Sequence, residues 1–359
     1  MRRSALQPSA PRPGPLLATP WLLLAVAGIV LGGVAAASGY APATATAPAA
    51  TAAAASASPR FQVAWQLVHE RYWDLSHSAI DWDEARHTFG ERPVADDDEL
   101  DALLIEMYEA IGDDHSRYLP PSLVDEQRDL LGGLPCIGYF GHASTAEDGL
   151  HTAGDAGAPP PADAPLELRA AGPVTFALWP DGIGYLRVPD LVRPGVAEGV
   201  RDAVIALERG GASALVLDLR GNPGGRLVTM MQVAGVFTRG LLWRTLTRWS
   251  LPLPYPALGT PATDLPLAIL VDAEVHSAAE GLAGALQAQG RAQVVGATTA
   301  GNVEAVLPFC LRDGSQAWIA TGVLAPLAGP TWEGRGVEPD LAVDPVKAAA
   351  AARAALAQR

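Results

Sequence analysis

The first regular pattern of apolar and polar positions lies near the N-terminal end of the chain and predicts helices. Apolar residues from Phe61 to Tyr72 recur mostly at helical spacing. Asp81–Arg86 opens with acidic residues, as the first turn of a helix often does. Between Asp97 and Ile111 the apolar residues fall on one helical face. We therefore expect a small helical subdomain over residues 60–130.

A second pattern begins at Ile183, where short apolar runs alternate with helical stretches. The helical pattern covers Val196–Arg209 and later Ala279–Ala288, and the run Leu267–Val271 has the composition of a buried strand. Such alternation predicts an α/β domain with helices packed on a mixed sheet, here expected over residues 181–345. Residues 346–359 are alanine-rich and predict a C-terminal helix or tail.

The stretches outside these patterns have a different composition. Residues 131–180 are rich in glycine and proline, with weak strand signals at Cys136–Phe140 and Val174–Leu178, and we expect a spacer there. Residues 38–59 contain mainly alanine, threonine, proline and serine without periodicity, which predicts a disordered linker.

The N-terminal end carries a targeting pattern. Arg2 and Arg3 precede the apolar stretch Trp21–Val34, and small residues follow it. A basic region, a short apolar core and small residues are typical of a secretory signal. Residues 1–37 are therefore expected to be a signal peptide or, if uncleaved, a membrane anchor. The protein is expected to be exported: periplasmic, secreted, or anchored and facing outward.

Charge and composition exclude several classes of binding partner. The net charge of −14 over 359 residues, with a pI near 4.9, argues against nucleic acid and anionic membrane surfaces. The two cysteines, Cys136 and Cys310, permit one disulfide in an oxidising compartment, or remain free thiols. No CxxC, HExxH or EF-hand pattern occurs, so we expect no metal site and no cofactor. Nothing in the sequence indicates an oligomeric state.

Two of the apolar runs end abruptly at residues that can carry chemistry. After Leu267–Val271 the chain reads Val275-His-Ser-Ala-Ala-Glu280, which brings Ser277 to the start of a helix. After Ala214–Leu219 it reads Arg220-Gly-Asn-Pro-Gly-Gly225, a turn whose backbone N–H groups are left bare. A serine beside exposed N–H donors is the arrangement that acyl transfer needs. The expected oxyanion hole consists of the N–H groups of Ala278 and of Gly224 or Gly225.

These residues also resemble a known family. The turn Leu217–Gly225 is similar to the D-x-R-x-N-x-G-G turn of the tail-specific proteases, which include C-terminal processing peptidases and tricorn core proteases. Further matches occur in the family's order: Ile111-Gly-Asp-Asp-His-Ser-Arg-Tyr-Leu119, Gly182-Ile-Gly-Tyr-Leu-Arg-Val188, the run Gly290-Arg-Ala292 with Gly296, Thr299 and Gly301, and Gly336-Val-Glu-Pro-Asp340. The resemblance implies a ClpP/crotonase-like core and a serine endopeptidase acting on proteins or peptides.

The chain departs from the family in two respects. The interval where the family usually carries a PDZ domain is about fifty residues long, shorter than the ~100 residues of an ordinary domain, so we expect that domain to be lost or reduced. The processing peptidases use a serine–lysine dyad, but here Asn302 occupies the lysine position and Val306 that of the accompanying glutamine. Lys347 is the only lysine in the chain. A serine–lysine mechanism is therefore excluded.

A different base is needed, and histidine is the residue that accepts a proton near neutral pH. The tricorn-type relatives use a histidine at the position of His115 and a glutamate that matches Glu333. The resemblance thus implies Ser277 as nucleophile, His115 as base and Glu333 as orienting group. Glu304 is the alternative third group. His276 is a poor base, because neighbouring side chains in an extended segment point in opposite directions.

Each assignment has a structural alternative. Ser277 followed by Glu280 is also a capping box, and His115 could simply close a helix. Asp218, Arg220, Asn222 and Glu280 are expected to brace the site. The function alternatives are an inactive pseudoprotease that binds peptides or hydrophobic ligands, and an esterase-like acyl hydrolase on the same scaffold.

Overall fold

The computed structural model describes residues 52–124, 137–138, 165 and 167–358. The expected export signal, residues 38–51 of the expected linker, Cys136 and most of the spacer lie outside these residues. The rest of the range expected to be a disordered linker is ordered: it forms β1 (Ala53–Ala54), η2 (Ala55–Ala57) and the start of the first helix. The predicted fold class, an α/β core with an N-terminal helical region, is confirmed. Within the described ranges, no helix has the length and apolar composition needed to span a bilayer.

The N-terminal region consists of three short helices whose starts are capped by side chains. Helix α1 covers Pro59–Arg71, α2 covers Trp82–Gly90 and α3 covers Asp97–Glu109. Ser58, Asp81 and Asp96 each accept a hydrogen bond from an N–H of the first turn. Minor elements flank them: β1 (Ala53–Ala54), η2 (Ala55–Ala57), η3 (Leu75–His77) and β2 (Pro93–Val94).

A seven-stranded sheet forms the centre of the α/β core, in the order β15-β12-β11-β8-β7-β6-β5. All neighbouring pairs from β15 to β7 are parallel, whereas β6 and β5 are antiparallel. The strands are β5 (Arg169–Ala171), β6 (Val174–Leu178), β7 (Ile183–Arg187), β8 (Ala214–Asp218), β11 (Leu267–Val271), β12 (Ala292–Gly296) and β15 (Leu341–Ala342).

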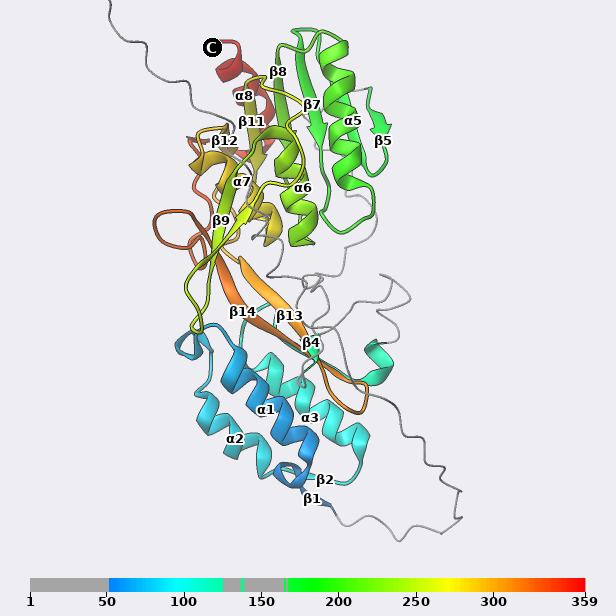
Figure 1. Cartoon of the computed structure of the whole chain (residues 1–359), viewed down its shortest axis with the longest axis vertical. Helices are drawn as coiled ribbons and strands as arrows, with labels where there is room; N and C mark the ends of the chain where they lie inside the picture. The colour runs from blue at the N-terminus through cyan, green and yellow to red at the C-terminus, as the bar shows by residue number, and fades with distance from the viewer. Residues whose placement is uncertain (1–51, 125–136, 139–164, 166, 359) are drawn as a thin grey trace, which may run out of the picture. The chain divides into compact units, whose positions relative to one another are not determined.

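Helices cover both faces of this sheet, which explains why its inner strands β8 and β11 are buried at every position. Helices α5 (Val196–Arg209), α6 (Leu227–Phe237) and α7 (Ala278–Ala288) pack on one face, where Leu217 and Ile269 point. Helix α8 (Ala348–Leu356), which follows η4 (Pro345–Lys347), packs on the other face (Figure 1).

A second, six-stranded sheet has the order β10-β9-β14-β13-β4, with β3 also paired to β14. Its longest strand, β14, pairs with β13, β3 and β9 at different points along its length. Buried residues of β13 and β14 share one hydrophobic core with α1, α2 and α3. The strands are β3 (Arg117–Leu119), β4 (Ile137–Gly138), β9 (Leu241–Leu246), β10 (Leu253–Pro256), β13 (Glu304–Cys310) and β14 (Gln316–Pro326).

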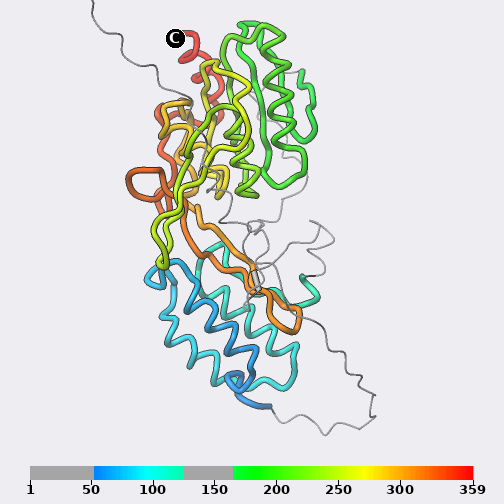
Figure 2. Tube along the Cα trace, in the orientation of Figure 1, coloured from blue at the N-terminus to red at the C-terminus, as the bar shows by residue number. Residues whose placement is uncertain are grey.

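The course of the chain explains how segments remote in sequence meet (Figure 2). After α3 the chain enters the second sheet through β3 and β4, and then forms β5 to β8 of the seven-stranded sheet. It passes through β9 and β10 of the second sheet, adds β11 and β12 to the seven-stranded sheet, and returns to the second sheet through β13 and β14 before β15. The segment between α3 and β3 is thereby fastened to residues nearly two hundred positions later, because β3 pairs with β14.

Three details add to what the sequence pattern predicted. Strands β5 and β6 lie in the range expected for the spacer but pair into the seven-stranded sheet. The alanine-rich C-terminal stretch is a helix that buries Ala348, Ala349 and Ala352 against that sheet. Cys310 is disulfide-bonded, and the only other cysteine, Cys136, lies outside the described residues.

Candidate active site

The candidate site lies at the carboxyl ends of parallel strands. Strands β8, β11 and β12 are neighbours in the seven-stranded sheet. Their carboxyl ends share one edge, where open α/β sheets commonly bind ligands. The Gly-Gly turn follows β8 and the serine segment follows β11. Residues 297–303 follow β12, so all three connections meet at this edge.

Ser277 has a strained backbone. Its φ of 52° and ψ of −124° make it the one non-glycine residue with positive φ in the described part of the chain. Such conformations cost of order 1–3 kcal/mol and persist where the surrounding structure holds them, often at active sites. Ser277 also begins α7 in a capping box with Glu280. The capping alternative and the nucleophile assignment are therefore compatible, but capping alone gives no reason for the strain.

Helix α7 explains how the strained turn is held. All residues from Ala278 to Leu286 are buried. A Cβ on Gly281 would approach Leu324 and Met230 to below 3 Å, and one on Gly284 would lie 2.5 Å from the Trp332 ring. The small residues of this helix thus allow it to pack tightly on both sides, which fixes its N-terminal end and Ser277.

The Gly-Gly turn lies directly against Ser277. A Cβ on Gly224 would be 2.8 Å from the Ser277 Cβ and from the His276 carbonyl oxygen. The Gly224 N–H donates to Asn222 Oδ1 at 2.8 Å, so it is already engaged. In the part of the chain that the structure describes, neither the Gly225 N–H nor the Ala278 N–H donates a hydrogen bond. The expected pair of oxyanion donors is thus Gly225 and Ala278.

The turn itself is braced by buried polar side chains. Asp218 accepts hydrogen bonds from the Arg220 guanidinium at 2.9 and 2.7 Å and from the Tyr185 hydroxyl at 2.7 Å. Asn222 donates through Nδ2 to the Val188 carbonyl at 2.9 Å. Arg220 also donates to the Pro345 carbonyl. The side chains that were expected to brace the site thus contact the surrounding strands and the Pro345 backbone: Asp218, Arg220 and Asn222.

Glu280 connects the serine turn to the segment after β12. Its carboxylate accepts hydrogen bonds from the Ser277 N–H at 3.2 Å, the Thr299 hydroxyl at 2.5 Å, the Gly301 N–H at 2.6 Å and the Asn302 N–H at 2.9 Å. Burial raises the pKa of Glu280, and these donors oppose the rise by favouring the ionised form. One carboxylate thus ties together two of the three connections at this edge.

His115 enters from the segment between α3 and β3. Its side chain is 1% exposed, and its Nδ1 lies 2.8 Å from Glu304 Oε2, at the start of β13. The preceding Asp113 accepts from the backbone N–H groups of His115 and Ser116. Ser116 in turn accepts from the Ala320 N–H through its hydroxyl, which attaches the segment to β14.

Burial shapes the protonation of the His115–Glu304 pair. It lowers the pKa of His115 to about 4, with Arg117 and His276 acting in the same direction and Asp113 opposing. Burial and the nearby Asp113 raise the pKa of Glu304 to about 8. The imidazole is therefore held neutral, the form that can accept a proton.

Glu333 and His276 lie at different points of the site. Glu333 accepts from the Val303 N–H at 2.7 Å, and burial together with Glu304 raises its pKa to about 8. His276 is half-buried, and its backbone N–H donates to the backbone carbonyl of Asn222 at 3.1 Å. Glu304, the alternative third group, is thus the carboxylate in contact with the imidazole, while Glu333 contacts the backbone just before it.

Sequence reasoning passed over Asp114. Its Oδ2 accepts a hydrogen bond at 2.9 Å from Nδ2 of Asn302, whose carbonyl accepts from the Ser277 N–H at 2.8 Å. The sequence signal was weak: an acidic residue beside a candidate base, and a polar residue at the family's lysine position. Only the fold brings the two together.

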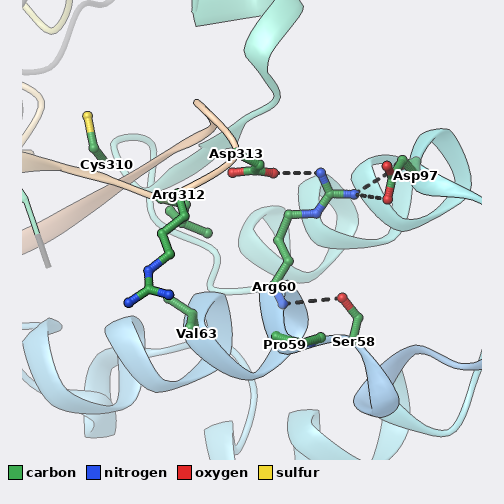
Figure 3. A pocket seen from close by; sticks show the side chains of 9 residues that line it. Ser58, Pro59, Arg60, Val63, Asp97, Cys310, Arg312 and Asp313 are labelled. Carbon is green, nitrogen blue, oxygen red and sulfur yellow. Dashed lines mark hydrogen bonds and ion pairs between the residues drawn. The ribbon is translucent and has the colours of Figure 1, made fainter. Parts of the chain in front are cut away.

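A cavity of about 500 Å³ elsewhere in the molecule shares no residue with this site. It is lined by the start of α1, Asp97 and residues 310–313 of the turn between β13 and β14. Figure 3 shows Arg60 at its wall, bound to Asp97 and Asp313. These three charges are paired with one another, and none of the candidate catalytic residues lines the cavity.

Comparisons with known proteins find similarity to peptidases. Residues 182–343 match the model of peptidase family S41. The carboxyl-terminal-processing protease of Picosynechococcus sp. is 37% identical over 134 residues, which cover 37% of this chain and 32% of that protein. The carboxy-terminal-processing protease of Bartonella bacilliformis is 27% identical over 175 residues, covering 45% and 39%. The matches thus span between about a third and two fifths of these relatives.

Solved structures show the same fold. The photosystem II D1 C-terminal processing protease superposes with a TM-score of 0.58 at 22% identity, over 79% of this chain and 92% of that chain. A lipoprotein from Streptococcus agalactiae superposes with a TM-score of 0.59 at 15% identity, over 89% and 100%.

Proposed function

The chain belongs to peptidase family S41 through residues 182–343, and we propose that it is a serine endopeptidase that cleaves proteins or peptides through an acyl-enzyme. The observation that carries the proposal is the strained Ser277, which begins a buried helix directly beside the Gly-Gly turn. Unoccupied N–H groups at Gly225 and Ala278 support the same reaction, because acyl transfer needs donors for a developing oxyanion.

In the proposed mechanism the Ser277 hydroxyl attacks the scissile carbonyl carbon while His115 accepts its proton. The C–O bond forms as the carbonyl π pair moves to oxygen, and the resulting oxyanion accepts from the Gly225 and Ala278 N–H groups. His115 then donates the proton to the leaving amine as the C–N bond breaks. A water molecule, deprotonated by His115, hydrolyses the acyl-enzyme and regenerates Ser277.

We assign the orienting role to Glu304. A triad needs a carboxylate against the imidazole nitrogen that does not face the serine. The 2.8 Å contact between Glu304 Oε2 and His115 Nδ1 supports that role. Glu333, which the family resemblance implied, has a different role in this scheme: its carboxylate accepts from the Val303 N–H and so holds the backbone next to Glu304.

We further propose that the enzyme works outside the cytoplasm. The basic and apolar pattern at the N-terminus supports export. The disulfide at Cys310 adds a second argument, because disulfides persist mainly in oxidising compartments. The N-terminal segment, if retained, would tether the enzyme to the membrane.

The test is hydrolysis by the full chain and by Ser277→Ala of a panel of unstructured proteins, peptides and activated esters. The proposal predicts cleavage of peptide bonds by the wild type and none by the variant. Cleavage of esters alone would favour the esterase-like hydrolase. Equal inactivity of both proteins on every substrate would favour the pseudoprotease, for which the absence of the family's lysine is the supporting observation.

A further inference from the structure

Asparagine is rare in this protein, and both copies lie at the candidate site. The sequence contains only Asn222 and Asn302. Asn222 braces the Gly-Gly turn, as described above. Asn302 lies in the connection after β12, on the other side of Ser277, and its function is not part of the mechanism derived so far.

Asn302 makes contacts in three directions. Its carbonyl accepts from the Ser277 N–H at 2.8 Å, and its own N–H donates to Glu280 Oε2 at 2.9 Å. Its side-chain Nδ2 donates to Asp114 Oδ2 at 2.9 Å, across 188 positions of sequence. Because a carboxylate can only accept, the amide must present its NH2 group to Asp114, which defines its orientation.

These contacts connect the segment that carries the proposed base with the segment that carries the proposed nucleophile. The segment that carries His115 is otherwise attached to the second sheet, through β3, through Ser116 and through Glu304. Ser277 lies at the start of α7, in the segment that follows β11 of the seven-stranded sheet. The bond between Asn302 and Asp114 joins the residue next to the base to the residue that holds the backbone of the nucleophile.

We propose that Asn302 is a positioning residue that, together with Asp114, sets the placement of His115 relative to Ser277. The inference rests on the proposed function, in which His115 takes the proton of Ser277. Asn302 holds the position at which the processing peptidases carry their catalytic lysine. Here that position supplies a hydrogen bond to the base's own segment and no proton acceptor.

The bond is suited to positioning rather than to global stability. Asp114 is exposed and Asn302 is partly exposed. Solvent-exposed polar contacts add little to the stability of a fold. A small displacement of a catalytic group, in contrast, can reduce turnover strongly, by about a hundredfold for ~1 Å. Removing the bond should therefore change turnover much more than the melting temperature.

The test compares Asn302→Asp, Asp114→Asn and the double variant that exchanges the two residues. Asn302→Asp leaves two carboxylates and no donor, so it removes the bond. Asp114→Asn keeps a donor and an acceptor and removes only the charge of the acceptor. The exchange restores the pair in the opposite direction and keeps the net charge. Asp98→Asn, on the exposed first turn of α3, makes the same chemical change away from the site and serves as the control.

We expect Asn302→Asp to lower kcat at least ~10-fold with KM little changed, and the exchange to recover most of the loss. Asp114→Asn, which can keep the hydrogen bond, should cost less than Asn302→Asp. The pH profile should move as well. Asn302→Asp adds a negative charge beside His115 and should shift the midpoint of the pH profile upward. Asp114→Asn removes a negative charge and should shift the midpoint downward, and the exchange should return it to the wild-type value. Losses that the exchange does not recover, or full activity with only a lower melting temperature, would overturn the inference.

A readout independent of turnover separates this inference from the proposed function. The imidazole signals of His115, assigned by their loss in His115→Ala, are followed by NMR during pH titration of the full chain. They should move in both single variants and return in the exchange. A wild type without hydrolytic activity would defeat the proposed function, but identical His115 signals in all four proteins would defeat the positioning role.

Discussion

The serine side and the base side of the site are held in different ways. Ser277 and the Gly-Gly turn follow adjacent parallel strands, and main-chain packing presses Gly224 against Ser277. His115 and Glu304 come from segments far apart in sequence that meet through side chains. The proposed nucleophile is thus placed by one sheet edge, whereas the proposed base depends on contacts between segments remote in sequence.

The largest effect is expected where the base itself is removed. His115→Ala should lower kcat at least ~10³-fold, as the loss of a triad member does. His276→Ala is the matched control, because it removes the neighbouring histidine, and it should keep most activity. The steady-state kinetics of the two variants on one peptide decide between them. The opposite ranking would assign the base to His276.

The next effect separates the two buried glutamates. Glu304→Gln should lower kcat by roughly 10²-fold or more, because the amide can no longer stabilise the imidazolium that forms. Glu333→Gln keeps the same shape and should cost less than about tenfold, since its contact is with the Val303 N–H. A larger loss in Glu333→Gln would restore Glu333 as the orienting group.

On the serine side, glycine variants distinguish close packing from backbone strain. Gly224 and Gly240 have similar positive φ angles, 95° and 90°, but only Gly224 has atoms within reach of a new Cβ. Gly224→Ala should push on Ser277 and lower kcat at least ~10-fold, besides losing stability. Gly240→Ala should lose stability alone. Comparable kcat values for the two folded variants would mean that the Gly-Gly turn does not define the nucleophile.

The pH dependence of kcat/KM reports on the base side. The base form requires an ionised Glu304 facing a neutral His115. Because burial raises the pKa of Glu304 to about 8, this carboxyl holds its proton at lower pH, and the active form accumulates as pH rises. The rate should rise roughly tenfold per pH unit below a midpoint near 8. A rate that falls as pH rises from about 6 to 8 would contradict the assignment.

The smallest effect is expected at Lys347. This residue is exposed and follows Pro345, whose carbonyl binds Arg220. A lysine that acts as a base must be kept neutral by burial near the nucleophile. Lys347→Ala should therefore retain near wild-type turnover in the same assay. Loss of hydrolysis in a folded Lys347→Ala protein would show that an amine takes the serine proton after all.

The serine side could be predicted from the sequence because its signals are local. The runs Leu267–Val271 and Ala214–Asp218 form strands, the pattern at Val196–Arg209 forms a helix, and the turn residues follow them directly. The parallel pairing of neighbouring strands then brings the two turns together. Close packing explains why the turn needs Gly224 and why α7 needs Gly281 and Gly284.

The base side could be predicted only in part. The motif around His115 pointed to that residue, but the choice between Glu304 and Glu333 depends on which carboxylate meets the imidazole. That contact follows from β3 pairing with β14 and β13 pairing with β14, and register between remote strands is not encoded in a short pattern. The Asp114–Asn302 bond and the disulfide state of Cys310 were undetermined for the same reason.

The central claim is that Ser277 is a nucleophile activated by His115. The most direct measurement is the site and rate of covalent labelling of the full chain by a fluorophosphonate, followed by intact-mass and peptide-mapping mass spectrometry. The account predicts one adduct, on Ser277, whose formation slows at least ~10³-fold in His115→Ala. An adduct on another residue, no adduct at all, or equal rates in the wild type and His115→Ala would contradict it.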